Sequence, residues 1–103
     1  MNQALQRLFR RHDLPPWIPE YRLRGPGGER IRVDFAWPAV KLAVEGDSVR
    51  WHAGRLDVQR NARKANVLVN LGWSVYHYTS IDVRYRPATI TAEVRSFLAR
   101  HAA

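Results

Sequence analysis

Two neighbouring stretches of the chain, residues 30–37 and 40–47, alternate apolar and polar side chains and are separated only by Pro38 and Ala39. The apolar positions are Ile31, Val33, Phe35 and Trp37 in the first stretch and Val40, Leu42 and Val44 in the second. Because successive side chains of a strand point to opposite faces, both stretches predict half-buried β-strands. A connection this short places the two strands side by side.

The polar faces of these two strands carry three carboxylates, Asp34 on the first and Glu45 and Asp47 on the second. One residue separates Glu45 from Asp47, so their side chains project together about 7 Å apart at the backbone. Like charges brought together raise each other's pKa unless a cation joins them, and Mg²⁺ prefers such oxygen ligands. The pattern therefore predicts a metal site. The alternative is ordinary cross-strand pairing with Arg30, Arg32 or Lys41.

Hydrophobic periodicity and turn residues predict the remaining elements. These are a helix over 2–12, a strand over 21–24 with a turn over 25–28, a helix over 55–70, a strand over 73–78, and a last helix near Pro87 after capping residues at 79–82. The expected apolar faces are Ala4, Leu5, Leu8 and Phe9 in the first helix, Val58, Ala62, Ala65 and Val69 in the second, and Ile90, Val94, Phe97 and Leu98 in the last. The predicted order is helix, three strands, helix, strand, helix.

The chain has 17 Lys and Arg residues against 9 Asp and Glu, a formal net charge of +8, and 15 of the 17 are Arg. This excess favours a polyanionic partner, because a planar guanidinium holds two phosphate oxygens at once. A G+C-rich genome, which raises the Arg content, is the alternative explanation. The length of 103 residues predicts a single domain over residues 1–103.

Cysteine is absent, so neither disulfides nor a thiolate zinc site can hold the fold. The N-terminal stretch is amphipathic and Arg-rich and contains no apolar run typical of a signal peptide. No stretch approaches membrane-spanning length. We therefore expect a cytoplasmic protein that has no membrane partner.

Two further sets of residues are candidates for contact with a nucleic acid. Arg60, Arg63 and Lys64 share one face of the second predicted helix, where they are expected to bind phosphates. A solvated helix face is the alternative.

His52 follows Asp47 by five residues, and imidazole titrates near neutrality, so it is a candidate proton donor to the leaving oxygen. An exposed loop histidine is the alternative.

An ordered set of motifs extends over residues 33–73: these are 33–38 (VDFAWP), 42–47 (LAVEGD), Trp51-His52, and 68–73 ending in Gly72-Trp73. This set resembles the very-short-patch-repair branch of the PD-(D/E)XK superfamily. The resemblance implies an α/β, restriction-endonuclease-like core with a mixed sheet flanked by helices. The chain departs from the pattern at Asp47, where the superfamily usually has its signature lysine, and in the first helix, where related sequences often carry a glutamate.

The resemblance implies a Mg²⁺-dependent DNA endonuclease or nickase, with Mn²⁺ as an alternative ion. Asp34 and Glu45 would bind the metal, Asp47 would complete the site or orient water, and His52 would assist. The competing hypothesis is a catalytically degenerate module of the same fold that binds nucleic acid or a partner protein. DNA is the expected partner, and a homodimer is left open.

Overall fold

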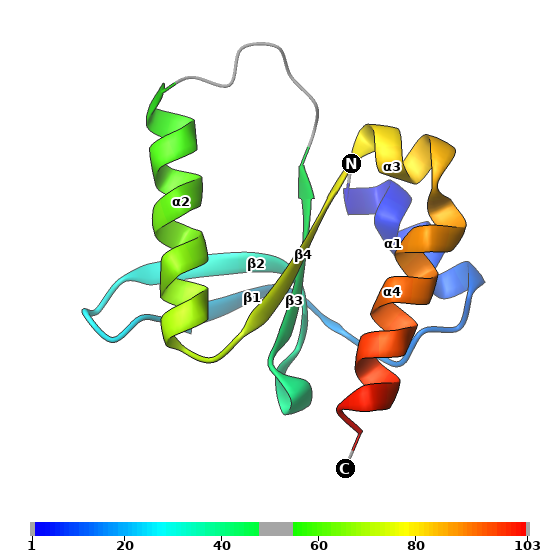
Figure 1. Ribbon diagram of the computed structural model, residues 1–103, viewed down its shortest axis with the longest axis horizontal. Helices are drawn as coiled ribbons and strands as arrows, with labels where there is room; N and C mark the ends of the chain where they lie inside the picture. Colours follow the sequence, from blue (N-terminus) through cyan, green and yellow to red (C-terminus); the bar gives the residue numbers. More distant parts are fainter. Residues whose placement is uncertain (1, 48–54, 103) are drawn as a thin grey trace.

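The computed structural model describes residues 2–47 and 55–102, and for residues 55–57 it describes the backbone alone. The elements are α1 (Asn2–Arg11), β1 (Ile18–Arg24), β2 (Arg30–Trp37), the 3₁₀ turn η1 (Pro38–Val40), β3 (Leu42–Asp47), α2 (Arg55–Asn70), β4 (Ser74–Thr79), α3 (Ser80–Tyr85) and α4 (Pro87–Arg100). Figure 1 shows these elements in the order that the sequence predicted, with one added helix, α3. None of the described helices is long and apolar enough to cross a membrane.

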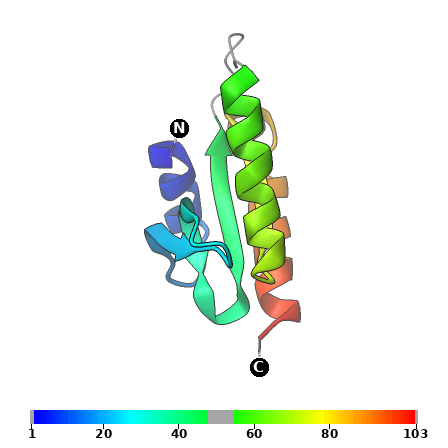
Figure 2. The same cartoon turned by 90° about the vertical axis from the view of Figure 1, so that its left-hand side faces the viewer.

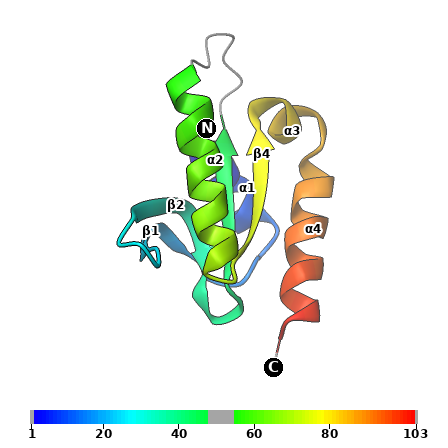
Figure 3. The ribbon, with the colours of Figure 1, turned by 60° about the vertical axis from the view of Figure 1, so that its left-hand side comes forward.

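The four strands form one mixed sheet in the order β1-β2-β3-β4. The first two pairs are antiparallel. Strands β3 and β4 are parallel, because α2 carries the chain back to the end of the sheet at which β3 begins. Helix α2 covers one face, while α1 and α4 lie on the other (Figures 1 and 3). Both faces of the central strands are therefore buried.

Each face of the sheet has its own apolar cluster. The larger cluster joins Leu5, Leu8 and Phe9 of α1 and Ile90, Val94 and Phe97 of α4 to Phe35, Trp37, Leu42 and Val44 of the sheet. The smaller cluster joins Val33, Ala36 and Ala43 to Leu68 of α2 and to Trp73. The predicted apolar faces of the first and last helices are confirmed, and Trp37 and Trp73 are both buried.

Strand β2 bends at Asp34, which was not expected. Ile31 and Val33 pack on the α2 side and Phe35 on the other, so the predicted single apolar row is divided between the two clusters. On β1, Glu20 lies between the pairs Pro19↔Phe35 and Tyr21↔Val33 and has a φ of 48°. Such a φ is uncommon outside glycine and marks a local bend. Beyond this point, the β1–β2 hairpin leaves the rest of the sheet.

The buried face of α2 differs from the predicted one. Val58 and Val69, assigned to the apolar stripe, are 60% and 68% exposed, whereas Val67 and Leu68 are buried. The buried side chains Val67 and Leu68 lie in the C-terminal half of the helix, and Leu68 packs in the smaller cluster of the sheet. This orientation places Lys64, one turn before Leu68, on the half-buried side of the helix.

The capping residues at 79–82 begin a helix of their own rather than the last helix. The Thr79 hydroxyl accepts a hydrogen bond from the Asp82 amide at 3.2 Å, and the Asp82 carboxylate accepts one from the Thr79 amide at 2.9 Å. This reciprocal capping box fixes the start of α3. Pro87 then begins α4, as the sequence predicted.

Candidate functional site

Asp34 and Glu45 lie where β2 and β3 separate. Ladder pairing between these strands is confined, in the described part of the chain, to Phe35–Trp37 with Leu42–Val44. Just beyond it, a carboxylate oxygen of Glu45 (Oε2) accepts a hydrogen bond from the Asp34 amide at 3.0 Å. An oxygen of Asp34 (Oδ2) accepts one from the Gly46 amide at 2.9 Å. The two side chains thus replace the missing ladder bonds and hold each other in place, and we call them the acid pair.

Glu45 is buried and meets a cation from the opposite layer. Glu45 is only 4% exposed, and this burial raises the pKa of its carboxyl group. The Lys64 ammonium of α2 forms an ion pair with Oε1 of Glu45 and lowers that pKa in part, while the nearby charge of Asp34 raises it. A buried acid with a specific cationic partner is typical of functional sites, because burying a charge is otherwise costly.

Asp47 has a different neighbour. It ends β3, its side chain is about half exposed, and its carboxylate lies 2.9 Å from Nδ1 of His77 on β4. In residues 2–47 and 55–102, no group of three or more His, Asp or Glu side chains is spaced to hold a metal ion. The structure therefore brings Asp34 and Glu45 together and separates Asp47 from them. A role for Asp47 as a metal ligand stays a prediction.

The sequence pointed to His52, which lies outside the described residues, and it did not single out His77. In the parallel pairing of β3 with β4, Glu45 is in register with His77. The two residues therefore lie side by side on adjacent strands. Only the strand order reveals this, since 32 positions separate them in the sequence and no metal-ligand spacing marks His77.

The three predicted phosphate-binding residues line one groove. This groove has a volume of about 520 Å³ and lies between α2 and residues 29–32, at the start of β2, with Arg60, Arg63 and Lys64 along its helical wall. Arg60 is exposed, Arg63 forms an ion pair with Glu29, and Lys64 reaches the acid pair. Lys64 thus links the groove to Glu45, and phosphate contact by these three residues stays a prediction.

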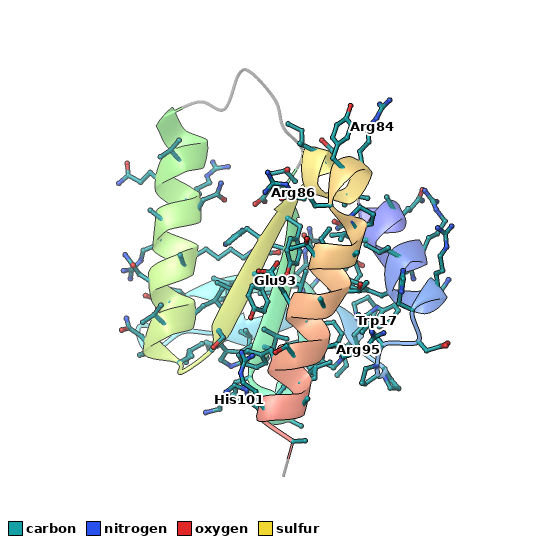
Figure 4. All side chains as sticks on the ribbon, turned by 45° about the vertical axis from the view of Figure 1, so that its right-hand side comes forward. Trp17, Arg84, Arg86, Glu93, Arg95 and His101 are labelled. Atoms are coloured by element: carbon teal, nitrogen blue, oxygen red, sulfur yellow. The ribbon has the colours of Figure 1, made fainter. Side chains whose placement is uncertain are left out.

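A second polar pocket lies at the carboxyl end of β4. It has a volume of about 210 Å³ and is lined by His77, Tyr78, Asp82, Arg86, Thr89, Ile90 and Glu93. Glu93 extends from α4 toward the sheet and accepts a hydrogen bond from the Tyr78 hydroxyl at 3.2 Å (Figure 4). This contact joins α4 to β4.

The fold is the predicted α/β arrangement, a mixed sheet flanked by helices, and a solved endonuclease domain shares it. Among solved structures, the catalytic domain of the homing endonuclease I-Bth0305I superposes with a TM-score of 0.74 at 18% sequence identity, covering 99% of this chain and 96% of that domain. Assignment to the very-short-patch-repair branch stays a prediction.

The sequence matches no protein-family model. An uncharacterized protein of Mycobacterium tuberculosis, designated MT2308 in one strain and Rv2248 in another, is 39% identical to this chain over 89 residues. The match covers 86% of this chain but 33% of that protein. The chain therefore spans about a third of the length of the curated relatives that it matches.

Proposed function

We propose that this chain is a metal-dependent DNA endonuclease or nickase that hydrolyses phosphodiester bonds at the acid pair. The observation that carries the proposal is the reciprocal hydrogen bonding of Asp34 and Glu45 at the divergence of two strands, with Glu45 buried. Stability alone does not explain a buried carboxylate with a raised pKa at this position. The likeness to a homing endonuclease catalytic domain supports the proposal at the level of the fold.

The donor set of the acid pair fits Mg²⁺, with Mn²⁺ as an alternative. Asp34 and Glu45 supply hard carboxylate oxygens from adjacent strands, and Mg²⁺ in proteins commonly takes one or two carboxylates together with water and substrate phosphate. A bound ion would offset the charge of the scissile phosphate and make a water molecule nucleophilic. The backbone amides of Asp34 and Gly46 hold the two carboxylates in fixed orientations before any ion arrives.

Other side chains of the site have supporting roles in the proposal. Lys64 supplies a cation beside the acid pair from α2, whereas the related superfamily usually carries its lysine on the strand, where this chain has Asp47. Asp47 orients water at the end of β3, and His52 donates a proton to the leaving oxygen. Arg60 and Arg63 bind phosphates along the groove that ends at Lys64.

Nicking of supercoiled plasmid tests the proposal. We expect the purified protein to convert supercoiled plasmid to open circles in Mg²⁺ or Mn²⁺, because ionised Asp34 and Glu45 then hold the ion against the phosphate. Excess chelator should abolish nicking, and added Mg²⁺ should restore it. Gel retardation of the same plasmid, measured in chelator, reports binding independently. Retardation without nicking in either ion would contradict the nuclease proposal.

One observation favours a second function, a nucleic-acid-binding module that does not cut. Both carboxylate oxygens of Glu45 already have partners, the Asp34 amide at Oε2 and Lys64 at Oε1. An ion that uses Oε1 must displace the Lys64 ammonium. In a binding module, the ion pair would instead be permanent and would fasten α2 to the sheet. The plasmid assay separates the two functions, because only the nuclease responds to the metal.

Lys64→Gln tests whether Lys64 acts through Glu45. The ammonium lowers the pKa of Glu45, so its removal raises that pKa further above the ordinary value. Since only the ionised carboxylate holds a cation, we expect the acid side of the pH profile of nicking to move to higher pH. Initial rates from pH 5 to pH 9 measure this shift.

Lys64→Arg keeps a cation at the same place and should largely restore the wild-type profile. Lys41→Gln removes the other lysine, which is exposed between η1 and β3, and is the matched control. A uniform loss of rate in Lys64→Gln at every pH would show that Lys64 contacts phosphate and does not act on Glu45.

A further inference from the structure

The β1–β2 hairpin carries four arginines on one face, and neither the acid pair nor the α2 groove accounts for all of them. They are Arg22, Arg24, Arg30 and Arg32, which we call the arginine face. All four are exposed, and together with Leu23 and Ile31 they line a groove of about 670 Å³. The hairpin register sets Arg22 opposite Arg32 and Arg24 opposite Arg30, so the four side chains share one face of the ribbon.

The opposite face of the hairpin is apolar and fastens it to the domain. Leu23 and Ile31 pack with Tyr21 against the cluster around Leu68 and Trp73, and the Tyr21 and Trp73 rings lie 5.8 Å apart. The turn also rests on α2, since a Cβ atom at Gly25 would lie 2.8 Å from Cγ1 of Val67. The hairpin is therefore an anchored arm, which extends away from α1 and α4 in Figure 1 and points toward the viewer in Figure 2.

The positive charge of the arginine face is little compensated within the described part of the chain. Like charges directly opposite each other destabilise a hairpin. Arg32 lies 3.5 Å from Glu20, but both side chains are exposed, and such pairs contribute little. Glu29, the acid nearest the turn, instead accepts a hydrogen bond from the Gly27 amide at 2.8 Å and pairs with Arg63. Two pairs of arginines set opposite each other destabilise the isolated hairpin, so their presence indicates an anionic partner that offsets the repulsion.

We propose that the arginine face binds the phosphate backbone of duplex DNA and guides it to the acid pair, an inference that rests on the proposed function. Arg30 and Arg32 line both this groove and the α2 groove, so the basic surface is continuous from the hairpin to Lys64, the partner of Glu45. The guanidinium fork suits phosphate oxygens, and a two-stranded ribbon is narrow enough for the major groove.

The composition of the arginine face favours duplex over single-stranded nucleic acid. Proteins that hold single strands stack the bases on aromatic side chains. In the part of the hairpin that carries these arginines, residues 21–32, the aromatic residue is Tyr21, and it packs on the opposite face against Trp73. The face offers charge without a stacking surface, and that combination matches a regular phosphate backbone whose bases are already paired.

A pair of double variants with equal loss of charge tests the inference. Arg24→Gln with Arg30→Gln neutralises one cross-strand pair of the arginine face. Arg10→Gln with Arg100→Gln removes two exposed charges from α1 and α4 and is the control. Fluorescence anisotropy of a labelled duplex, titrated in chelator at several KCl concentrations, gives the salt dependence of binding.

The hairpin variant should bind duplex about tenfold more weakly at low salt. A plot of log K against log[KCl] should also have a slope shallower by about 2, because each lost phosphate contact removes about 0.9 from the slope. The control should keep the wild-type slope. Equal slopes in the two variants would overturn the inference. So would an equal or larger loss of binding to a single-stranded oligonucleotide or to anionic phospholipid vesicles.

Two measurements keep these outcomes interpretable. The melting temperature of the hairpin variant should equal or exceed that of the wild type, because a like-charge pair has been removed. Arg22→Gln with Arg32→Gln, the other cross-strand pair, should repeat the result. A wild type that binds through the arginine face but never nicks contradicts only the nuclease proposal. A wild type that nicks while both hairpin variants bind normally contradicts only this inference.

Discussion

Glu45→Gln is expected to reduce plasmid nicking by at least about a thousandfold, because a lost metal ligand forfeits several kcal/mol of transition-state stabilisation. Glutamine keeps the shape of the side chain and can still accept the hydrogen bond from the Asp34 amide, so the acid-pair geometry survives. Duplex binding should stay intact or tighten slightly, since a negative charge facing phosphate has been removed. Nicking rates at saturating Mg²⁺ and anisotropy on the same duplex measure the two effects.

Stability provides an independent check on the same variant. The pKa of Glu45 is higher in the folded protein than in the unfolded chain, because burial penalises the charged form. Protonation therefore favours folding, and the stability that Glu45 contributes falls as the pH rises through its folded-state pKa. At neutral pH, the uncharged glutamine should melt at a higher temperature than the wild type, and this advantage should shrink at acid pH.

Glu93→Gln is the matched control, because Glu93 is an exposed residue of α4 and its replacement can still accept the Tyr78 hydrogen bond. It should nick and bind like the wild type. Nicking by Glu45→Gln at the wild-type rate would mean that the acid pair is structural and that the nuclease proposal is wrong. A lower melting temperature for this variant would instead show that the ion pair with Lys64 outweighs the cost of burying the charge.

Phe9→Ala is expected to destabilise the fold by about 3–5 kcal/mol, a large part of the roughly 5–15 kcal/mol that a domain of ordinary stability has. The Phe9 side chain is fully buried in the larger cluster. Its ring centroid lies 5.1 Å from that of Phe35, 5.5 Å from that of Trp17 and 5.9 Å from that of Trp37. Alanine would leave a cavity between α1 and β2, and Phe35, which lines it, directly follows Asp34.

Urea unfolding followed by tryptophan fluorescence measures this loss. Phe9→Leu retains most of the buried volume and should cost less than Phe9→Ala. Val69→Ala changes a residue that is 68% exposed and should alter the free energy of unfolding by no more than about 0.5 kcal/mol. A loss below about 1 kcal/mol in Phe9→Ala would show that α1 does not belong to the cooperative core, in contrast to its packing in the structure.

Several features of this protein could be predicted from the sequence because their causes are local. The alternation in residues 40–47 predicted strand β3 and its two faces, with Leu42 and Val44 on one side and Ala43 on the other. The predicted helix over residues 55–70 agrees with α2 at both ends. Asp34 and Glu45 were correctly singled out as neighbours, because a short connection forces their strands together.

The tertiary structure decided which face of α2 is buried and what each acid contacts. Periodicity on that helix favoured the stripe through Val58 and Val69, whereas packing buries Val67 and Leu68. The selected face carries Lys64 to Glu45, a contact that joins residues 19 positions apart and depends on helix orientation. The pairing of Asp47 with His77 depends likewise on the adjacency of β3 and β4. Such contacts arise only when distant segments pack together, so no local pattern in the sequence encodes them.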